Sequence, residues 1–203
     1  MTPTHSHPTS PPPVTSADLL KLTVEQYHRM GETGVLTPDD RVELLEGLLV
    51  SKPMKKPPHA VATELTRTAL AGVIPAGWYV RGQEPITLDD SEPEPDLALV
   101  PGSPRTYVPR HPFPAEVAIV VEVADTSLVR DRDWKKRIYA RNGIAVYWIV
   151  NLVDRVLEVY ADPSGPVLTP DYGTAKFLSL TDRADVAVGG TVAGTVAVAD
   201  LIP

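Results

Sequence analysis

The sequence predicts an α/β fold in which a mixed β-sheet is flanked by α-helices. Between residues 117 and 150 a strand, a helix and a strand follow one another at the spacing of a βαβ unit, whose two strands are parallel. Strand candidates at 95–100 and 117–124 are joined by a segment with five prolines, which excludes a crossover helix and favours antiparallel pairing. A sheet with both kinds of pair is mixed.

Length and composition limit the function classes. The chain has 203 residues, 43% hydrophobic and 22% charged, so we expect one globular domain over 17–203. Residues 1–16 are rich in Pro, Ser and Thr and predict a disordered tail, in which we interpret His5 and His7 as incidental. The absence of Cys excludes thiolate chemistry and Cys-ligated metals. No apolar run approaches the roughly 20 residues of a membrane span and no signal peptide is evident, so a cytoplasmic protein is expected.

Local signals place the first elements. Thr23 followed by Gln26 is a capping box, which predicts a helix that ends near Gly31. The pair Glu46 and Gly47 between two apolar stretches predicts a two-residue hairpin turn.

Helix stops and alternating apolar residues place the remaining elements. We expect a helix over 59–74, a strand over 78–88, a helix that is capped by Thr126 or Ser127 and stops at Gly143, a strand over 145–150, and further strands after Arg155 with turns at 163–165 and 189–190.

One carboxylate stands inside a run that is typical of a buried strand, VAIVVEVA. Along residues 117–124, alternation puts Ala118, Val120, Glu122 and Ala124 on one face and Val117, Ile119, Val121 and Val123 on the other. Antiparallel pairing brings the start of the 95–100 strand beside the end of this one, so Asp96 and Glu122 become neighbours. A buried carboxylate needs a cation or hydrogen bonds.

The helix that follows offers that cation. Asp131, Lys135 and Tyr139 are spaced at i, i+4 and i+8 on one stripe, and Lys135 can extend along the sheet towards the strand ends, whereas Lys136 faces outward. Two carboxylates and a lysine suit a divalent cation such as Mg²⁺ and a phosphodiester substrate. On spacing alone, a structural ion pair between Glu122 and Lys135 explains them equally well.

The segments SEPEPDLALV, VVEVADTS and RDRDWKKRIYARNGIAVYWIV resemble a bacterial restriction endonuclease family of the PD-(D/E)XK nuclease superfamily, from about residue 23 to the C-terminus. The resemblance implies a restriction-endonuclease-like α/β fold and an endonuclease that hydrolyses DNA with Mg²⁺ or Mn²⁺. It implies Asp96 and Glu122 as catalytic metal ligands, with the Val123 carbonyl as a further ligand.

The resemblance also assigns the lysine. The superfamily's usual lysine two residues after the acid is absent, because Ala124 stands there. In the family the lysine is displaced into the next helix, four residues before a tyrosine, and this position is Lys135, which would orient the nucleophilic water. Asp131 matches a frequent acidic position that caps the helix or partners Lys135.

Two secondary candidates follow from the same resemblance. Glu43 matches a recurrent glutamate that would serve as an additional metal or water-orienting ligand. His59 would contact phosphate or the metal shell, or is a surface histidine at a helix start. By contrast, Glu46 is explained by its turn, and we interpret Glu92 and Glu94 as a solvated acidic loop and Gln83 and Glu84 as exposed strand residues.

Charge distribution bears on the partner. A net charge of −7 argues against a protein that coats nucleic acid with its whole surface, but two local basic groups would let a DNA backbone approach. They are Arg130, Arg132, Lys135, Lys136, Arg137 and Arg141 in one segment, and Lys52, Lys55, Lys56 and His59 in the other. No membrane partner is expected, and the resemblance implies a homodimer with Tyr147, Trp148 or the C-terminal strands at its interface.

Two other functions stay open on the sequence. One is a catalytically inactive DNA-binding or protein-interaction module that keeps the nuclease fold and uses the same residues as an ion-pair cluster. The other is a metal-dependent hydrolase of a smaller phosphoester.

Overall fold

The computed structural model describes residues 19–203. The expected tail at 1–16, with His5 and His7, lies outside the described residues, so the division into a tail and one domain over 17–203 stays a prediction. Among the described residues, no helix is long and apolar enough to cross a membrane.

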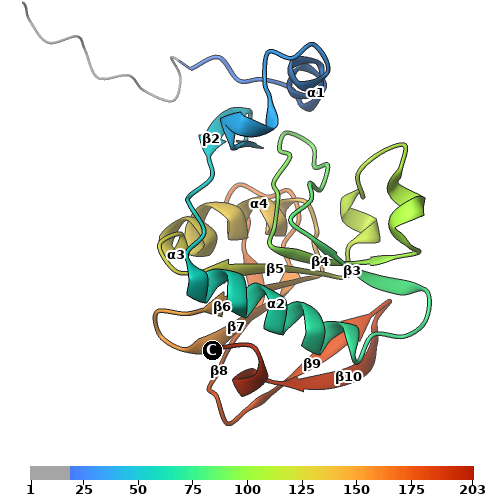
Figure 1. Ribbon diagram of the computed structural model, residues 1–203, viewed down its shortest axis with the longest axis vertical. Coiled ribbons are helices and arrows are strands. Elements are labelled where there is room, and N and C mark those ends of the chain that lie inside the picture. Colours follow the sequence, from blue (N-terminus) through green and yellow to red (C-terminus); the bar gives the residue numbers. More distant parts are fainter. Residues whose placement is uncertain (1–18) are drawn as a thin grey trace, which may run out of the picture.

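A six-stranded mixed sheet forms the centre of the fold, in the order β3-β4-β5-β6-β7-β8 (Figure 1). Its strands are β3 (Trp78–Gly82), β4 (Leu97–Pro101), β5 (Ile119–Ala124), β6 (Val146–Asn151), β7 (Val156–Pro163) and β8 (Tyr172–Leu178). Strands β5 and β6 are parallel, whereas β4 and β5 and the other neighbouring pairs are antiparallel. The predicted α/β class and mixed sheet are therefore confirmed.

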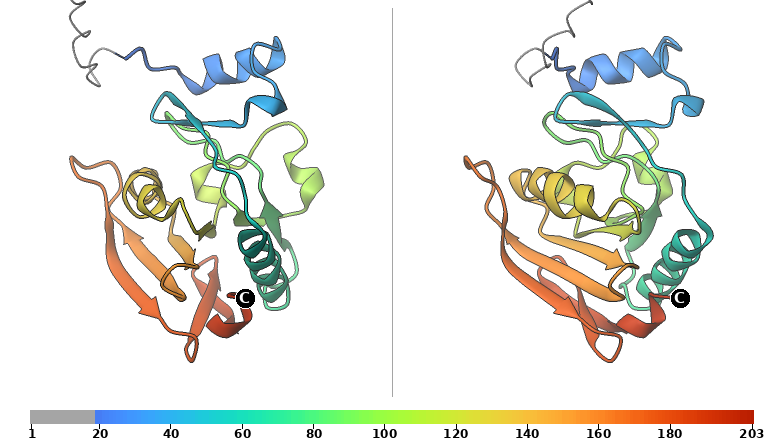
Figure 2. Two further views of the ribbon diagram at one scale, coloured as in Figure 1. Left: turned by 60° about the vertical axis from the view of Figure 1, so that its left-hand side comes forward. Right: turned by 90° about the vertical axis from the view of Figure 1, so that its left-hand side faces the viewer.

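Helices cover both faces of this sheet. Helix α2 (Pro57–Ala71) packs on one face with the hairpin of β9 (Arg183–Val188) and β10 (Thr191–Ala197) and the 3₁₀ turn η6 (Val198–Asp200). Figure 2 shows this hairpin beside α2 at one end of the molecule. The other face carries the crossover from β5 to β6, made of α3 (Leu128–Arg130), η5 (Asp131–Lys135) and α4 (Lys136–Arg141). The sheet is thus buried on both sides.

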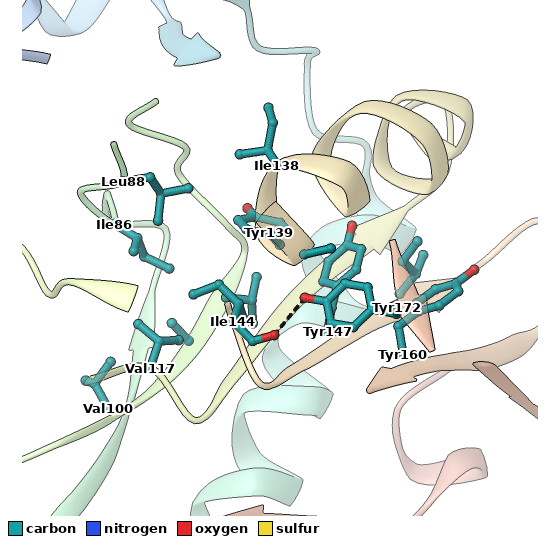
Figure 3. Close-up of a cluster of buried hydrophobic side chains, with 14 of the residues drawn as sticks. Ile86, Leu88, Val100, Val117, Ile138, Tyr139, Ile144, Tyr147, Tyr160 and Tyr172 are labelled. Atoms are coloured by element: carbon teal, nitrogen blue, oxygen red, sulfur yellow. Dashed lines mark hydrogen bonds between the residues drawn. The ribbon is translucent and has the colours of Figure 1, made fainter. Parts of the chain in front are cut away.

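The crossover packs on a cluster that is rich in tyrosine. Ile138 and Tyr139 of α4 are fully buried there with Tyr147 of β6, and the Tyr172 hydroxyl donates a hydrogen bond to the Ile144 carbonyl at 2.9 Å (Figure 3). Burial of such large side chains fixes the rotation of α4 about its own axis. This rotation decides which residues of the crossover face the strand ends.

The N-terminal elements lie at the opposite end from the C-terminal hairpin (Figures 1 and 2). They are α1 (Val24–Glu32), the 3₁₀ turn η2 (Pro38–Asp40), β1 (Val42–Leu45) and β2 (Leu48–Ser51). The expected capping box is present, since the Gln26 amide donates to Thr23 Oγ1 and the Thr23 amide to Gln26 Oε1. Glu46 and Gly47 have φ angles of 49° and 80°, as a type I′ hairpin turn requires.

Some predicted boundaries are wrong. The strand predicted over 78–88 ends at Gly82, because Gln83 takes a φ of 54° and leaves the extended conformation. The helix predicted over 59–74 spans 57–71, with two prolines in its first turn, where no amide donor is needed. The predicted side-chain alternation holds from Ile119 onward, but Val117 and Ala118 exchange faces, because a 3₁₀ turn (η4, Pro114–Glu116) immediately precedes them.

The 3₁₀ turn η3 (Pro104–Tyr107) and η4 interrupt the proline-rich connection between β4 and β5. No crossover helix forms there, as the prolines predict. The two strands consequently run side by side in opposite directions, which sets up the arrangement of acids described next.

Candidate functional site

A cavity of about 390 Å³ opens at the end of the sheet where β4 begins and β5 finishes. Its charged lining comes from both halves of the chain: Arg41, Glu43, Lys52, Lys55, Lys56, His59, Glu94, Asp96, Glu122, Asp125, Arg130, Asp131 and Lys135. All five predicted catalytic side chains line it, and so does Val123, the predicted source of a carbonyl ligand.

Asp96 and Glu122 lie next to each other on adjacent strands. The register pairs Leu97 with Val121, and its continuation by one residue places Asp96 opposite Glu122 on the same face of the sheet. The Val123 amide donates a hydrogen bond to Asp96 Oδ2 at 2.9 Å, which ties the first acid to the strand of the second. Both residues are almost fully buried, at 5% and 4% exposed.

Lys135 joins Glu122 to Glu43. Its Nζ lies 2.9 Å from Glu122 Oε1 and 3.1 Å from Glu43 Oε2, and its side chain is only 5% exposed. The Tyr139 hydroxyl donates to the same Glu122 Oε1 at 2.9 Å. Among the described residues no donor contacts Glu122 Oε2, so this oxygen can accept a further ligand.

The helix that carries Lys135 differs from the expected regular α-helix. Residues Asp131–Lys135 form a π-helical turn, in which the Lys136 amide bonds to the Asp131 carbonyl five residues earlier. The Tyr147 hydroxyl donates to this carbonyl at 3.2 Å and so secures the turn from the sheet. Ser127, one of the two predicted cap residues, holds the N-cap position of α3, but its side chain makes no capping hydrogen bond. Asp131 does not cap the helix start either, but is buried in the cavity lining.

Glu43 and His59 line the cavity from two different elements. Glu43 lies on β1, and the Glu94 amide donates to its Oε2 at 3.2 Å. His59 lies in the first turn of α2, with Nε2 3.1 Å from Asp96 Oδ2 and its side chain 13% exposed. His59 is therefore not a surface histidine, and both secondary candidates contact a primary one.

Negative charge exceeds positive charge around Glu122. Burial raises the pKa of Glu122 to about 8; Lys135 opposes this rise, whereas the charges of Asp131, Asp96 and Glu43 add to it. Burial likewise raises the pKa of Asp131. For Asp96 burial acts in the same direction, but His59, a nearby lysine and the Val123 amide outweigh it and lower the pKa. The carboxylates around Glu122 thus outnumber Lys135, the one cation that contacts it among the described residues.

The donor set suits a hard divalent cation. Asp96, Glu122 and the Val123 carbonyl offer oxygen ligands, which Mg²⁺ and Mn²⁺ prefer, and Glu122 Oε2 is available. Within 19–203, no group of three or more His, Asp or Glu side chains is arranged to hold a metal. Two carboxylates are nevertheless enough for Mg²⁺, since this ion usually keeps several waters.

Most of the predicted basic helix face points away from the cavity. Lys136 pairs with Asp171, Arg132 with Glu158, and Arg137 and Arg141 with Glu46. Only Lys135 and Arg130 of that group line the cavity. The second basic group does so completely, and Arg41, which nothing in the sequence singled out, joins it from the start of β1.

Glu46 occupies the predicted turn and lies outside the cavity, whereas the prediction that Glu92 is solvated is wrong. Glu46 does more than occupy its turn, since its carboxylate accepts hydrogen bonds from Trp134 and from two arginines of α4. Glu92 is not solvated but 1% exposed, because its amide pairs with the Leu44 carbonyl at 2.7 Å and draws the loop onto β1. Gln83 and Glu84 are exposed, as expected, although the strand ends before them.

Comparisons with known proteins agree with this architecture. Residues 24–190 match the model of the Uma2 family, described as "Putative restriction endonuclease". A solved structure of a "putative nuclease belonging to DUF820" from Anabaena variabilis ATCC 29413 superposes with a TM-score of 0.62 over 89% of this chain and 97% of that one. At 15% identity this likeness shows a common fold alone. A search of curated proteins gave no match.

Proposed function

The chain belongs to the Uma2 family, described as "Putative restriction endonuclease", and we propose that it is a Mg²⁺-dependent DNA endonuclease whose catalytic residues are Asp96, Glu122 and Lys135. One observation carries the proposal. A buried lysine is held between two carboxylates, and one of these, Glu122, which lies opposite Asp96 in the sheet, has an oxygen that no donor among residues 19–203 contacts. Oxygen ligands next to a fixed ammonium group suit the cleavage of a phosphodiester.

Each residue has a separate task in this proposal. Asp96, Glu122 and the Val123 carbonyl hold the cation, which supplies a Lewis acid for the phosphoryl oxygen and lowers the pKa of water. Lys135 orients the attacking water and stabilises the charge that develops on the phosphorus oxygens. Glu43 keeps the ammonium group of Lys135 in place through its 3.1 Å contact. His59 holds Asp96 through Oδ2 and turns Oδ1 towards the cavity.

A cleavage assay with matched variants tests the proposal. The purified chain is incubated with supercoiled, linear duplex and single-stranded DNA in Mg²⁺, in Mn²⁺ or in chelator. We expect metal-dependent cleavage of at least one form, and a loss of about 100-fold or more in Asp96→Asn, Glu122→Gln and Lys135→Met. Glu84→Gln removes an exposed carboxylate in the same way as Glu122→Gln and should retain activity.

Binding measurements separate the enzyme from its rival. The rival function, an inactive DNA-binding or protein-interaction module, is favoured by the ion pairs that Asp96 makes with Lys55 and His59 and that Glu122 makes with Lys135. If Mn²⁺ neither raises the melting temperature nor supports cleavage of any DNA form, and Glu122→Gln behaves like the parent, the enzyme proposal is wrong. A panel of nucleotides and small phosphoesters in the same assay addresses a smaller substrate.

A further inference from the structure

Five residues, Lys52 to Lys56, connect β2 to α2 (Figure 1). All five line the cavity. We call them the lysine strap. Its first part is fixed, because the Lys52 amide donates to the Arg41 carbonyl at 2.8 Å and the Arg41 guanidinium donates to the Pro53 carbonyl at 3.1 Å. The Arg130 guanidinium also donates to the Ser51 carbonyl, at 3.0 Å. The strap therefore keeps its lysines beside the acids.

Each lysine of the strap pairs with an acid from a different place around the cavity. Lys52 lies 2.5 Å from Glu94, and Lys56 lies 3.2 Å from Asp125. The third pair is the important one, since Lys55 Nζ lies 3.1 Å from Oδ1 of Asp96. Oδ2 of Asp96 already accepts from the Val123 amide and contacts His59. Lys55 thus occupies the oxygen that a metal would use.

The two ammonium groups nearest the metal ligands differ in how firmly they are held. Lys135 is 5% exposed and contacts two buried carboxylates, so its removal would strand buried charge. Lys55 is 38% exposed and contacts one carboxylate, that of Asp96. This carboxylate is buried but also accepts from the Val123 amide and contacts His59, so Asp96 keeps two partners when Lys55 leaves. Lys55 can therefore leave Asp96 at small cost, whereas Lys135 cannot leave Glu122.

We propose that Lys55 is an exchangeable counterion of Asp96, which leaves the carboxylate when a divalent cation binds and then pairs with a phosphate of the DNA backbone. The inference rests on the proposed function, from which it takes the metal ligands and the substrate. A cation at Asp96 repels Lys55 towards the open cavity, and a phosphate there draws it away from Asp96. Metal and DNA consequently favour each other's binding through this side chain, and the coupling is reciprocal.

Calorimetric titration of the full chain with Mn²⁺ in the absence of DNA tests the exchange directly. Lys55→Met keeps the length of the side chain and removes the competing charge, so it should bind Mn²⁺ about fivefold more tightly than the parent. Lys56→Met alters the adjacent lysine of the strap, which pairs with Asp125 instead, and should keep the parent affinity within about twofold. Melting temperatures of both variants establish that they are folded.

A second titration measures the coupling. A fluorescent DNA duplex is bound with and without Ca²⁺, which takes oxygen ligands. Ca²⁺ should increase the DNA affinity of the parent and of Lys56→Met by the same factor. In Lys55→Met this increase should be smaller, by about the ratio of the Mn²⁺ affinities of Lys55→Met and the parent.

The outcomes separate the inference from the proposed function. If Lys55→Met binds Mn²⁺ as tightly as the parent or more weakly, the inference is wrong. The proposed metal site still stands in that case if the parent binds Mn²⁺ and the Asp96→Asn variant does not. Mn²⁺ binding by Lys55→Met and not by the parent supports the inference in its strongest form. Absence of Mn²⁺ binding in both removes the metal site, and the inference fails with it.

Discussion

Replacement of Lys135 by methionine should show how much buried charge this one residue neutralises. Its side chain is 5% exposed, and the carboxylates at 2.9 and 3.1 Å, Glu122 and Glu43, are 6% and 2% exposed. Methionine preserves the bulk of the side chain but leaves both acids without their cation. Removal of one partner from a buried ion pair costs about 3 to 5 kcal/mol. For a chain of this size that corresponds to a melting temperature about 6 to 20 °C lower.

The loss of stability in Lys135→Met should be larger at high pH than at low pH. Without Lys135 the folded-state pKa of Glu122, which burial already raises, rises further above the ordinary value of about 4.3, so the folded protein binds more protons than the unfolded chain. The stability of the variant then falls as pH rises above about 4.5. The difference in free energy of unfolding between the parent and the variant should therefore be small near pH 5. Urea unfolding in chelator at pH 5 and pH 8, followed by tryptophan fluorescence, measures both values.

The next residue along the chain supplies the control. Lys136 makes one ion pair with Asp171, whose side chain is 60% exposed, so Lys136→Met should cost less than about 1 kcal/mol at either pH. If the two lysine variants lose the same stability, or if the loss in Lys135→Met is equal at both pH values, then Lys135 does not neutralise buried acids and the reasoning about the site is refuted.

Three further predictions concern other parts of the chain. Glu46→Gln should lower the free energy of unfolding by about 1 to 2 kcal/mol at pH 7, because Glu46 joins the first hairpin to the crossover helix. Hydrogen bonds and arginine charges lower the pKa of Glu46 despite burial, so its contribution to stability is present above pH 4.5 and is lost as pH falls below that value. Urea unfolding at pH 7 and pH 3 measures this difference. Gly47→Ala should lower the free energy of unfolding by about 1 to 3 kcal/mol, since the φ of Gly47 is 80° and a Cβ there would lie 2.7 Å from Lys21 Cβ. Gly31→Ala should instead stabilise the protein, because Gly31 lies in helix α1 and a Cβ there would meet no atom within 4 Å. A melting temperature of Gly31→Ala at or below that of Gly47→Ala would contradict this prediction. The parent in chelator should lose stability from pH 5 to pH 8, because the pKa of Glu122 is raised to about 8 and its proton is lost over that range; a parallel decline in Glu122→Gln would assign the effect elsewhere.

Features with a local cause could be predicted from the sequence. The prolines between β4 and β5 remove amide donors, so the absence of a helix there and the antiparallel pairing follow directly. The proximity of Asp96 to Glu122 is then a consequence of strand direction and needs no further information. The same holds for the Glu46–Gly47 turn, where two positive φ angles demand such residues.

Features that depend on the docking of distant segments could not be predicted. The Glu94 amide reaches Glu43, and Lys55 reaches Asp96, only because the first hairpin settles against the start of β4, which no periodic pattern encodes. The π-helical turn at Asp131–Lys135 has no compositional signal, and a tertiary hydrogen bond from Tyr147 supports it. Burial of Glu92 likewise comes from a single backbone bridge to β1, which the polar sequence around it conceals.

A second buried glutamate shows why burial of an acid does not by itself indicate a functional site. Glu158 is fully buried, and both of its oxygens are occupied, Oε1 by Arg132 and Asn151 and Oε2 by Arg132 and Tyr160. It does not line the cavity that Glu122 faces, nor two other cavities among the described residues.

Glu122 differs from Glu158 in each of these respects. Its two hydrogen bonds fall on one oxygen, its cation is shared with Glu43, and it faces a cavity next to two other acids, Asp96 and Asp131. A purely structural ion pair gains nothing from an open oxygen and a surplus of negative charge, since both reduce stability. A metal ligand requires both, because the incoming cation needs a free lone pair and a field that attracts it. The incomplete neutralisation of Glu122, rather than its burial, is therefore the property that favours a metal site over an ion pair.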